Sequence, residues 1–125
     1  MALREITLML LLSGAPWLSE FTSSSPVNAQ YVQQAEQRAL NLARTVAIKE
    51  NGGLGVYRPE KCMFATAAGP NPCLIQANPT GFTYRFVGGA PGWQESDAPP
   101  STETEIRIAP DGRSVLGMIY NGPIR

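Results

Sequence analysis

Apolar residues recur three or four positions apart between Tyr31 and Glu50, and no other stretch of the chain keeps this spacing for as long. They form one stripe: Val32, Ala35, Ala39, Leu42, Ala43 and Val46. Polar residues fill the opposite side: Gln33, Gln34, Gln37, Asn41 and Thr45. The pattern predicts an amphipathic helix that ends at Asn51-Gly52-Gly53, because glycine readily adopts the left-handed conformation that stops a helix. No side-chain cap marks its start. Because the stripe is rich in alanine, we expect a sheet to approach the helix closely.

The remainder of the chain has the pattern of short strands, and the stretch from Gly81 to Val87 gives the strongest signal. Its aromatic residues share one face: Phe82, Tyr84 and Phe86. We expect that face to pack on the helix stripe. A hairpin is predicted over Thr102–Tyr120, because Pro110-Asp111-Gly112 supplies good turn chemistry. The second arm of this hairpin is apolar on both faces, which favours a central position in the sheet.

Weaker patterns predict two further strands, at Cys62–Thr66 and Cys73–Ala77, and a short extended segment at Leu54–Tyr57. The connections between neighbouring strands are short, and short connections favour antiparallel pairing over crossovers. The predicted fold class is therefore α+β, with one N-terminal helix packed on a curled antiparallel sheet of four to five strands.

Composition narrows the range of functions. The chain has 125 residues, ten Lys or Arg against ten Asp or Glu, and no histidine. A balanced charge without basic runs argues against a nucleic-acid partner and against binding to an anionic membrane surface. Twelve glycines and eleven prolines agree with many turns and short strands.

The first 29 residues have the features of an export signal. Arg4 precedes an apolar run over Ile6–Leu12, and Val27-Asn28-Ala29 suits cleavage before Gln30. The run is shorter than the roughly 20 residues that span a bilayer, and no cysteine near the cleavage point would take a lipid. We predict a cleaved signal peptide at 1–29 and a single exported domain at 30–125, without membrane insertion after cleavage. An uncleaved anchor and a disordered leader are the alternatives.

The two cysteines, Cys62 and Cys73, flank a turn rich in proline. In an oxidising compartment a bridge between them is favoured, and closing so short a loop would stabilise the fold by roughly 2–3 kcal/mol. Unpaired buried thiols and a functional thiol pair are the alternatives. The spacing is not Cys-x-x-Cys and no histidine completes a zinc set, so we predict no metal site.

Catalytic side chains are scarce. Without histidine, neither a Ser-His-Asp nor a Cys-His arrangement can form. Glu103 and Glu105 share a strand face and resemble an acid–base pair, but the alternation with Arg107 favours a solvated outer face. Asp111 lacks the companion ligands of a calcium loop and is expected to be a turn residue. We predict no catalytic residue and no cofactor, and therefore that the chain is not an enzyme.

The long loop Gly88–Ser101 contains the most interesting side chain, Trp93. Loops of this length are uncommon inside compact domains and are often functional or disordered. Flanked by Pro91 and Gln94, Trp93 is a candidate anchor for a protein partner. The alternative is that it folds back and caps one end of the core.

Four segments carry a resemblance to known proteins: Cys62-Met63-Phe64, Gly81-Phe82-Thr83-Tyr84-Arg85-Phe86, Gly88-Gly89-Ala90-Pro91-Gly92-Trp93 and Tyr120-Asn121-Gly122-Pro123. Together they resemble a group of small exported cyanobacterial proteins of unknown function. The resemblance covers most of the mature chain and implies a periplasmic or thylakoid-lumen location.

The order of one helix followed by a sheet also resembles cystatin-like architecture. Cystatins bind proteases through a Gln-x-Val-x-Gly loop and a Pro-Trp in a second loop. Here Pro91-Gly92-Trp93 departs from the second element, and the first is missing. We therefore expect a non-catalytic exported binding or accessory module, with a peptidase inhibitor as the alternative. The pattern names neither the partner nor an oligomeric state.

Overall fold

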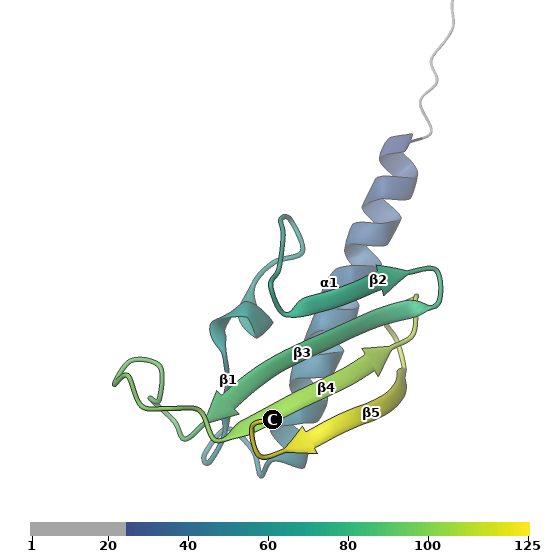
Figure 1. Cartoon of the computed structure of the whole chain (residues 1–125). Coiled ribbons are helices and arrows are strands. Elements are labelled where there is room, and N and C mark those ends of the chain that lie inside the picture. Colours follow the sequence, from purple (N-terminus) through teal and green to yellow (C-terminus); the bar gives the residue numbers. More distant parts are fainter. Residues whose placement is uncertain (1–24) are drawn as a thin grey trace, which may run out of the picture.

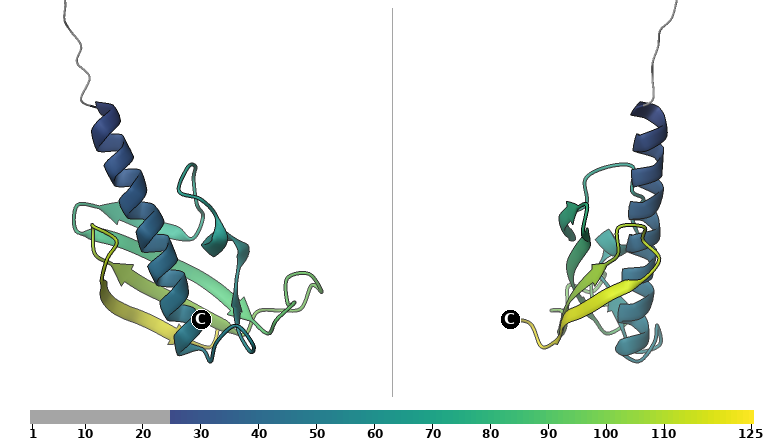
Figure 2. Two further views of the ribbon diagram at one scale, coloured as in Figure 1. Left: turned by 180° about the vertical axis from the view of Figure 1, so that it is seen from behind. Right: turned by 90° about the vertical axis from the view of Figure 1, so that its right-hand side faces the viewer.

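The structure, a computed structural model, describes residues 25–125, with side chains from Ala29 onward. One helix lies across one face of an open antiparallel sheet, so the molecule has two layers (Figures 1 and 2). The elements in chain order are helix α1 (Ser25–Glu50), strand β1 (Arg58–Pro59), 3-10 helix η1 (Lys61–Phe64) and strands β2 (Leu74–Asn78), β3 (Gly81–Gly89), β4 (Thr102–Ile108) and β5 (Val115–Gly122). The predicted α+β class, with four to five strands, is confirmed.

The strand order is β1-β3-β4-β5, and β2 also pairs with β3 beyond the end of β1. All neighbouring strands are antiparallel. The central strand β3 therefore has β4 on one side and the two short strands β1 and β2 in succession on the other. The face opposite α1 has no covering element in the part of the chain that the structure describes (Figure 2).

Four alanines, spaced four residues apart, bring α1 close to the sheet: Ala35, Ala39, Ala43 and Ala47. Each is at most 1% exposed, and Leu40 is buried beside them. The buried side of α1 is therefore rotated slightly about the helix axis from the predicted stripe. Leu42 and Val46 are only partly buried at its edge, whereas Val32, near the start of the helix, is 55% exposed. The helix contacts the sheet along its smallest side chains, and the larger ones flank that line.

The boundaries of α1 agree with the prediction at the end and differ at the start. Gly52 and Gly53 take φ values of 101° and 95°, and the Gly53 amide donates to the Ile48 carbonyl. The helix begins at Ser25, before Tyr31, and so continues through the predicted cleavage point at Gln30. The rest of the predicted signal peptide lies outside the described residues. Among the residues described, no helix combines the length and apolar character needed to cross a bilayer.

Aromatic residues of β3 face α1, as predicted, and alternate rows of β3 and β4 form the core. The register places Phe82 opposite Ile108, Tyr84 opposite Ile106 and Phe86 opposite Thr104, all 5% exposed or less. The Tyr84 hydroxyl donates to the Glu36 carbonyl of α1, 3.2 Å away. This bond fixes the sheet relative to the helix axis.

The second hairpin arm, β5, is an edge strand, so its predicted central position is wrong. Val115, Leu116 and Ile119 are 38%, 53% and 53% exposed. Two register shifts interrupt its pairing with β4. The apolar pattern on both faces was real, but β5 has a neighbour on one side only, and its bulges turn apolar side chains outward.

The segment 54–66 also differs from the prediction. Leu54–Tyr57 forms a turn, with the Val56 and Tyr57 amides both bonded to the Gly53 carbonyl. Extended pairing starts one residue later, at Arg58. In place of the predicted strand Cys62–Thr66 the structure has the 3-10 helix η1, whose Met63 is fully buried.

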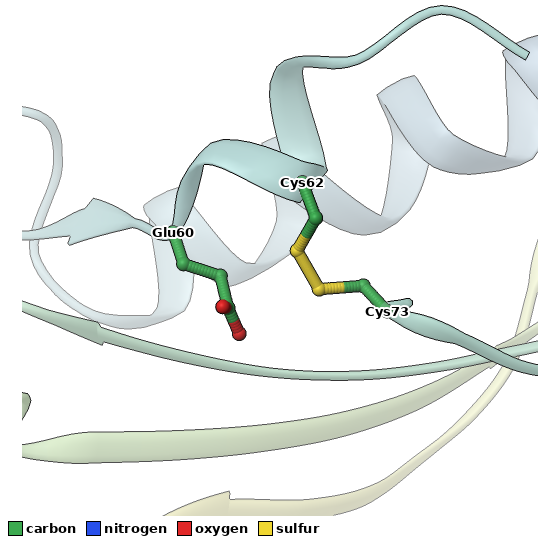
Figure 3. Close-up of side chains that lie close together, drawn as sticks. All are labelled: Glu60, Cys62 and Cys73. Atoms are coloured by element: carbon green, nitrogen blue, oxygen red, sulfur yellow. A yellow bond between two sulfur atoms is a disulfide. The ribbon is translucent and has the colours of Figure 1, made fainter. Parts of the chain in front are cut away.

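Cys62 in η1 and Cys73, which directly precedes β2, are joined by a disulfide with a Cα–Cα distance of 6.0 Å (Figure 3). The disulfide prediction is confirmed, and the alternative of unpaired thiols is wrong for this structure. Asn71 strengthens the same connection, because its side chain donates to the Cys62 carbonyl and accepts from the Cys73 amide. The bridge ties η1 to β2 across the loop between them.

Gly112, in the β4–β5 turn, marks where the sheet meets the backbone of α1. A Cβ there would lie 2.3 Å from the Ala35 carbonyl oxygen, and its φ is 75°. Gly112→Ala should therefore lower the free energy of unfolding by about 2–4 kcal/mol, through left-handed strain and a backbone clash. Denaturant titration measures this. Gly55→Ala, which meets nothing within 4 Å, is the control, and equal losses in both variants would contradict the close approach.

The disulfide gives a second stability prediction. The double variant Cys62→Ser/Cys73→Ser should unfold with a free energy about 2–3 kcal/mol below that of the oxidised chain, because the eleven-residue separation then closes no covalent loop. Urea titrations of both proteins provide the measurement. An unchanged midpoint would show that the bridge does not constrain the unfolded chain.

Candidate binding groove beside Trp93

The loop between β3 and β4 is ordered by its own backbone. The Trp93 amide donates to the Ala90 carbonyl, and the Ala98 amide closes back on the Trp93 carbonyl at 2.8 Å. Ser101 then bonds to Gly88, where β3 and β4 meet. This part of the predicted loop Gly88–Ser101 is a compact turn structure held at the end of the sheet (Figure 1).

Trp93 is 9% exposed, and its indole Nε1 donates to the Arg58 carbonyl of β1 at 2.9 Å. Its ring packs against Gly89, where a Cβ would lie 3.1 Å from Trp93 Cγ. On the opposite face of β3, the Tyr57 ring covers Gly88, and a Cβ there would lie 2.4 Å from Tyr57 Cε2. Two consecutive glycines thus let two aromatic rings pack on opposite faces of one strand end.

A groove of about 280 Å³ opens beside this arrangement. We call it the Trp93 groove. One wall comes from β1 and η1 and the other from the loop, and its lining residues are Arg58, Pro59, Lys61, Phe64, Gly92, Trp93, Gln94 and Glu95. The two walls are more than 25 residues apart in sequence. They meet because Arg58 and Pro59 pair with Gly89 and Gly88.

Phe64 forms the most exposed apolar part of the groove, with 53% of its surface open to solvent. The Arg44 guanidinium of α1 lies 5.0 Å from the centre of its ring and donates to the Met63 carbonyl. The disulfide attaches the same short helix to the residue that precedes β2. Phe64 is therefore exposed to solvent on a fixed support.

Positive charge predominates at this groove. Arg58 and Lys61 line one wall and are both exposed, and Arg44 lies behind Phe64. Glu95 is the one carboxylate among the lining residues. The ion pairs seen in the described chain lie elsewhere, on the open sheet face around Glu103 and Glu105.

Sequence reasoning found part of this groove. Trp93 and Gln94 line it, whereas Pro91 is exposed in the same loop and does not. Burial of the Trp93 ring agrees with the capping alternative, and the edge that remains faces the groove. The contributions of Lys61 and Phe64 were missed: Phe64 was expected inside a strand at Cys62–Thr66, and Lys61 had no predicted role. The aromatic–basic composition of Arg58–Phe64 was the available signal.

Glu103 and Glu105 share the open face of the sheet, but they do not form an acid–base pair. The Arg125 amide and guanidinium both bond to the Glu103 carboxylate, and the guanidinium reaches Glu105 as well. These hydrogen bonds lower the pKa of Glu103, so it stays ionised. Arg107 bonds instead to Gln76, Thr80 and Thr83. Asp111 is a turn residue, as predicted, and accepts the Arg113 amide.

One group of possible metal ligands occurs in the part of the chain that the structure describes. A carboxylate oxygen of Glu60 and the sulfurs of Cys62 and Cys73 all lie within 4.8 Å of one another (Figure 3). Sequence reasoning set the cysteines aside as ligands because no histidine accompanies them, and it did not consider Glu60.

Comparison of the chain with protein-family models, with curated proteins and with solved structures found no significant match. The groove and its chemistry therefore carry the functional argument.

Tyr57 gives a pH-dependent test of the packing behind the groove. Its hydroxyl is buried without a hydrogen-bond partner in the described chain, because the nearby Thr104 hydroxyl donates to Asn121 instead. Burial outweighs the influence of Thr104 and raises the pKa of Tyr57 from 10.0 to about 12. Above pH 10 the unfolded chain loses this proton first, so stability should fall between pH 10 and pH 12. Tyr57→Phe should make that fall shallower and, at pH 7, leave stability unchanged or raise it by up to about 1 kcal/mol.

Urea titrations across that pH range measure the effect, with Tyr31→Phe, at an exposed tyrosine, as the control. Tyr84→Phe should instead cost about 0.5–1.5 kcal/mol at neutral pH, because Tyr84 donates a hydrogen bond to Glu36. A loss at Tyr57→Phe as large as that at Tyr84→Phe would show that the Tyr57 hydroxyl has a partner.

Proposed function

We propose that this chain is a small exported, non-catalytic binding module, and that the Trp93 groove holds a short segment of a partner protein. The observation that carries the proposal is a groove with aromatic groups on both walls, Phe64 and Trp93, and an excess of positive charge. Phe64 is exposed, and its support is fixed by Arg44 and the disulfide. Rigid aromatic groups of this kind contribute disproportionately to protein recognition.

The chemistry of the groove favours an extended peptide with one apolar side chain and a nearby carboxylate. The apolar side chain would pack between Phe64, which is exposed, and Pro59, which is buried, and would remove apolar surface from water. The carboxylate would lie near Lys61 or Arg58, which are both exposed. Arg58 Nε already donates to the Leu54 carbonyl at 2.8 Å, so its terminal guanidinium nitrogens would meet the carboxylate. About 280 Å³ accommodates one or two side chains, so we expect a short motif and an affinity of about micromolar or weaker.

Reaction chemistry has less support in this groove. Its lining residues include one carboxylate, Glu95, and no cysteine, serine or tyrosine that such a base would activate. The chain also has no histidine. The features present serve recognition, through apolar contact and charge, better than proton or group transfer.

The export part of the proposal rests on the leader pattern and on the disulfide. Disulfides persist in oxidising compartments and are rare where thiols are kept reduced. The resemblance to small exported cyanobacterial proteins agrees with a periplasmic or thylakoid-lumen location. The peptidase-inhibitor alternative would need a second hairpin loop beside the Trp93 loop, but the β2–β3 turn lies at the opposite end of β3 (Figure 1).

Selection of peptides from a random displayed library, followed by binding measurements on the full chain, tests this proposal. Selected peptides should combine an aromatic or aliphatic residue with Asp or Glu. Phe64→Ala should weaken their binding at least about tenfold. Lys61→Glu should also weaken binding, and the loss should be larger at low salt than at high salt. Ile75→Ala, at an exposed site on β2, is the matched control. Peptides that bind Phe64→Ala as tightly as the parent chain would contradict the proposed groove.

A further inference from the structure

The junction between β1 and η1 places a carboxylate next to the disulfide. Glu60 lies two residues before Cys62, and Cys73 arrives from the far end of the loop that leads into β2. One carboxylate oxygen and the two sulfurs lie within 4.8 Å of one another. Figure 3 shows the Glu60 side chain leaving the backbone on the same side of η1 as the Cys62 side chain. Cys73 is 3% exposed, whereas Glu60 and Cys62 are half-buried and reachable from solvent.

Glu60 is held firmly in this position. Its amide donates to the Val87 carbonyl at 2.9 Å, and its Oε1 accepts the Val87 amide at 2.9 Å. These two bonds attach Glu60 to β3 and leave its second carboxylate oxygen without a hydrogen bond in the described chain. A hydrogen bond from the surrounding protein to a carboxylate is the usual means of orienting it as a metal ligand.

We propose that reduction of the Cys62–Cys73 bridge creates a site for one zinc-class divalent cation, with Cys62, Cys73 and Glu60 as protein ligands and water as the fourth. A dithiol reductant gives its two hydrogen atoms to the bridge, so the S–S bond breaks, both cysteines become thiols and the dithiol becomes a disulfide. On metal binding each thiol loses its proton to solvent, and each thiolate forms a bond to the metal.

The geometry suits tetrahedral coordination. Two Zn–S bonds of about 2.3 Å at a tetrahedral angle separate the sulfurs by roughly 3.8 Å. A Cα–Cα distance of 6.0 Å allows that separation through side-chain rotation alone. Two thiolates and one carboxylate select zinc, cobalt or cadmium over magnesium or calcium, which prefer oxygen ligands. Three protein ligands with one open position is the arrangement of an exchangeable site rather than a closed structural one.

The metal would replace the covalent connection between η1 and β2. It therefore keeps the same two segments together under reducing conditions, in which the bridge alone would be lost. This inference does not depend on the proposed peptide-binding function.

Cobalt titration of the full chain tests the proposal. The protein is reduced with a water-soluble phosphine, separated from it without oxygen, and titrated with Co²⁺. We expect one ion per chain, with thiolate-to-cobalt charge-transfer absorption and the visible bands of tetrahedral cobalt, both removed by Zn²⁺. The oxidised chain should show neither. Glu60→Gln keeps an oxygen for the Val87 amide but loses the anionic ligand, so it should bind at least about tenfold more weakly.

Glu95→Gln, a carboxylate removed from the nearby groove, is the matched control and should bind as the parent chain does. Cys62→Ser should abolish the charge-transfer absorption. The proposal is overturned if the reduced chain lacks this absorption, if one ion binds two chains, or if Glu60→Gln binds as tightly as Glu95→Gln. Thermal melting guards against unfolding: Zn²⁺ should raise the melting temperature of the reduced chain but not that of Cys62→Ser/Cys73→Ser. A reduced chain that stays unfolded with Zn²⁺ present also overturns it.

Discussion

The close contact between α1 and the sheet is the constraint on which this structure depends. Alanine at 35, 39, 43 and 47 leaves the helix backbone near the strands, and aromatic side chains of β3 fill the space that larger helix residues would otherwise occupy. Gly112 extends the same requirement to the β4–β5 turn, where even a methyl group would meet the helix backbone. Protein interiors are close-packed, so enlarging any one of these residues displaces a whole layer.

The pairing of a small residue with a large neighbour continues at the end of β3, and there it connects the core to the groove. Gly88 and Gly89 accept the rings of Tyr57 and Trp93 on opposite faces of the strand. Tyr57 belongs to the core, whereas Trp93 turns its remaining edge to the groove. The bond from Trp93 Nε1 to Arg58 then fixes the distance between the walls. A rigid core and a rigid groove are thus parts of one packing arrangement.

Local pattern was sufficient for the elements whose environment is local. The helix, its glycine stop, the aromatic strand and the Pro110-Asp111-Gly112 turn all follow from residue spacing and turn chemistry. Local pattern failed where residues distant in the sequence determine the conformation or position of a segment. The segment at Cys62 coils because the bridge and the Asn71 side chain both hold it at Cys62. Strand β5 is exposed because the described chain supplies no further strand beside it. The groove needed both kinds of information: Trp93 was visible in the sequence, but its opposite wall depends on a strand pair of two residues.

The overhang of α1 gives the molecule a direction. Its first turns project beyond the β2–β3 end of the sheet, while the Trp93 loop lies at the other end (Figures 1 and 2). A segment bound in the Trp93 groove would therefore leave the projecting start of the 26-residue helix uncovered.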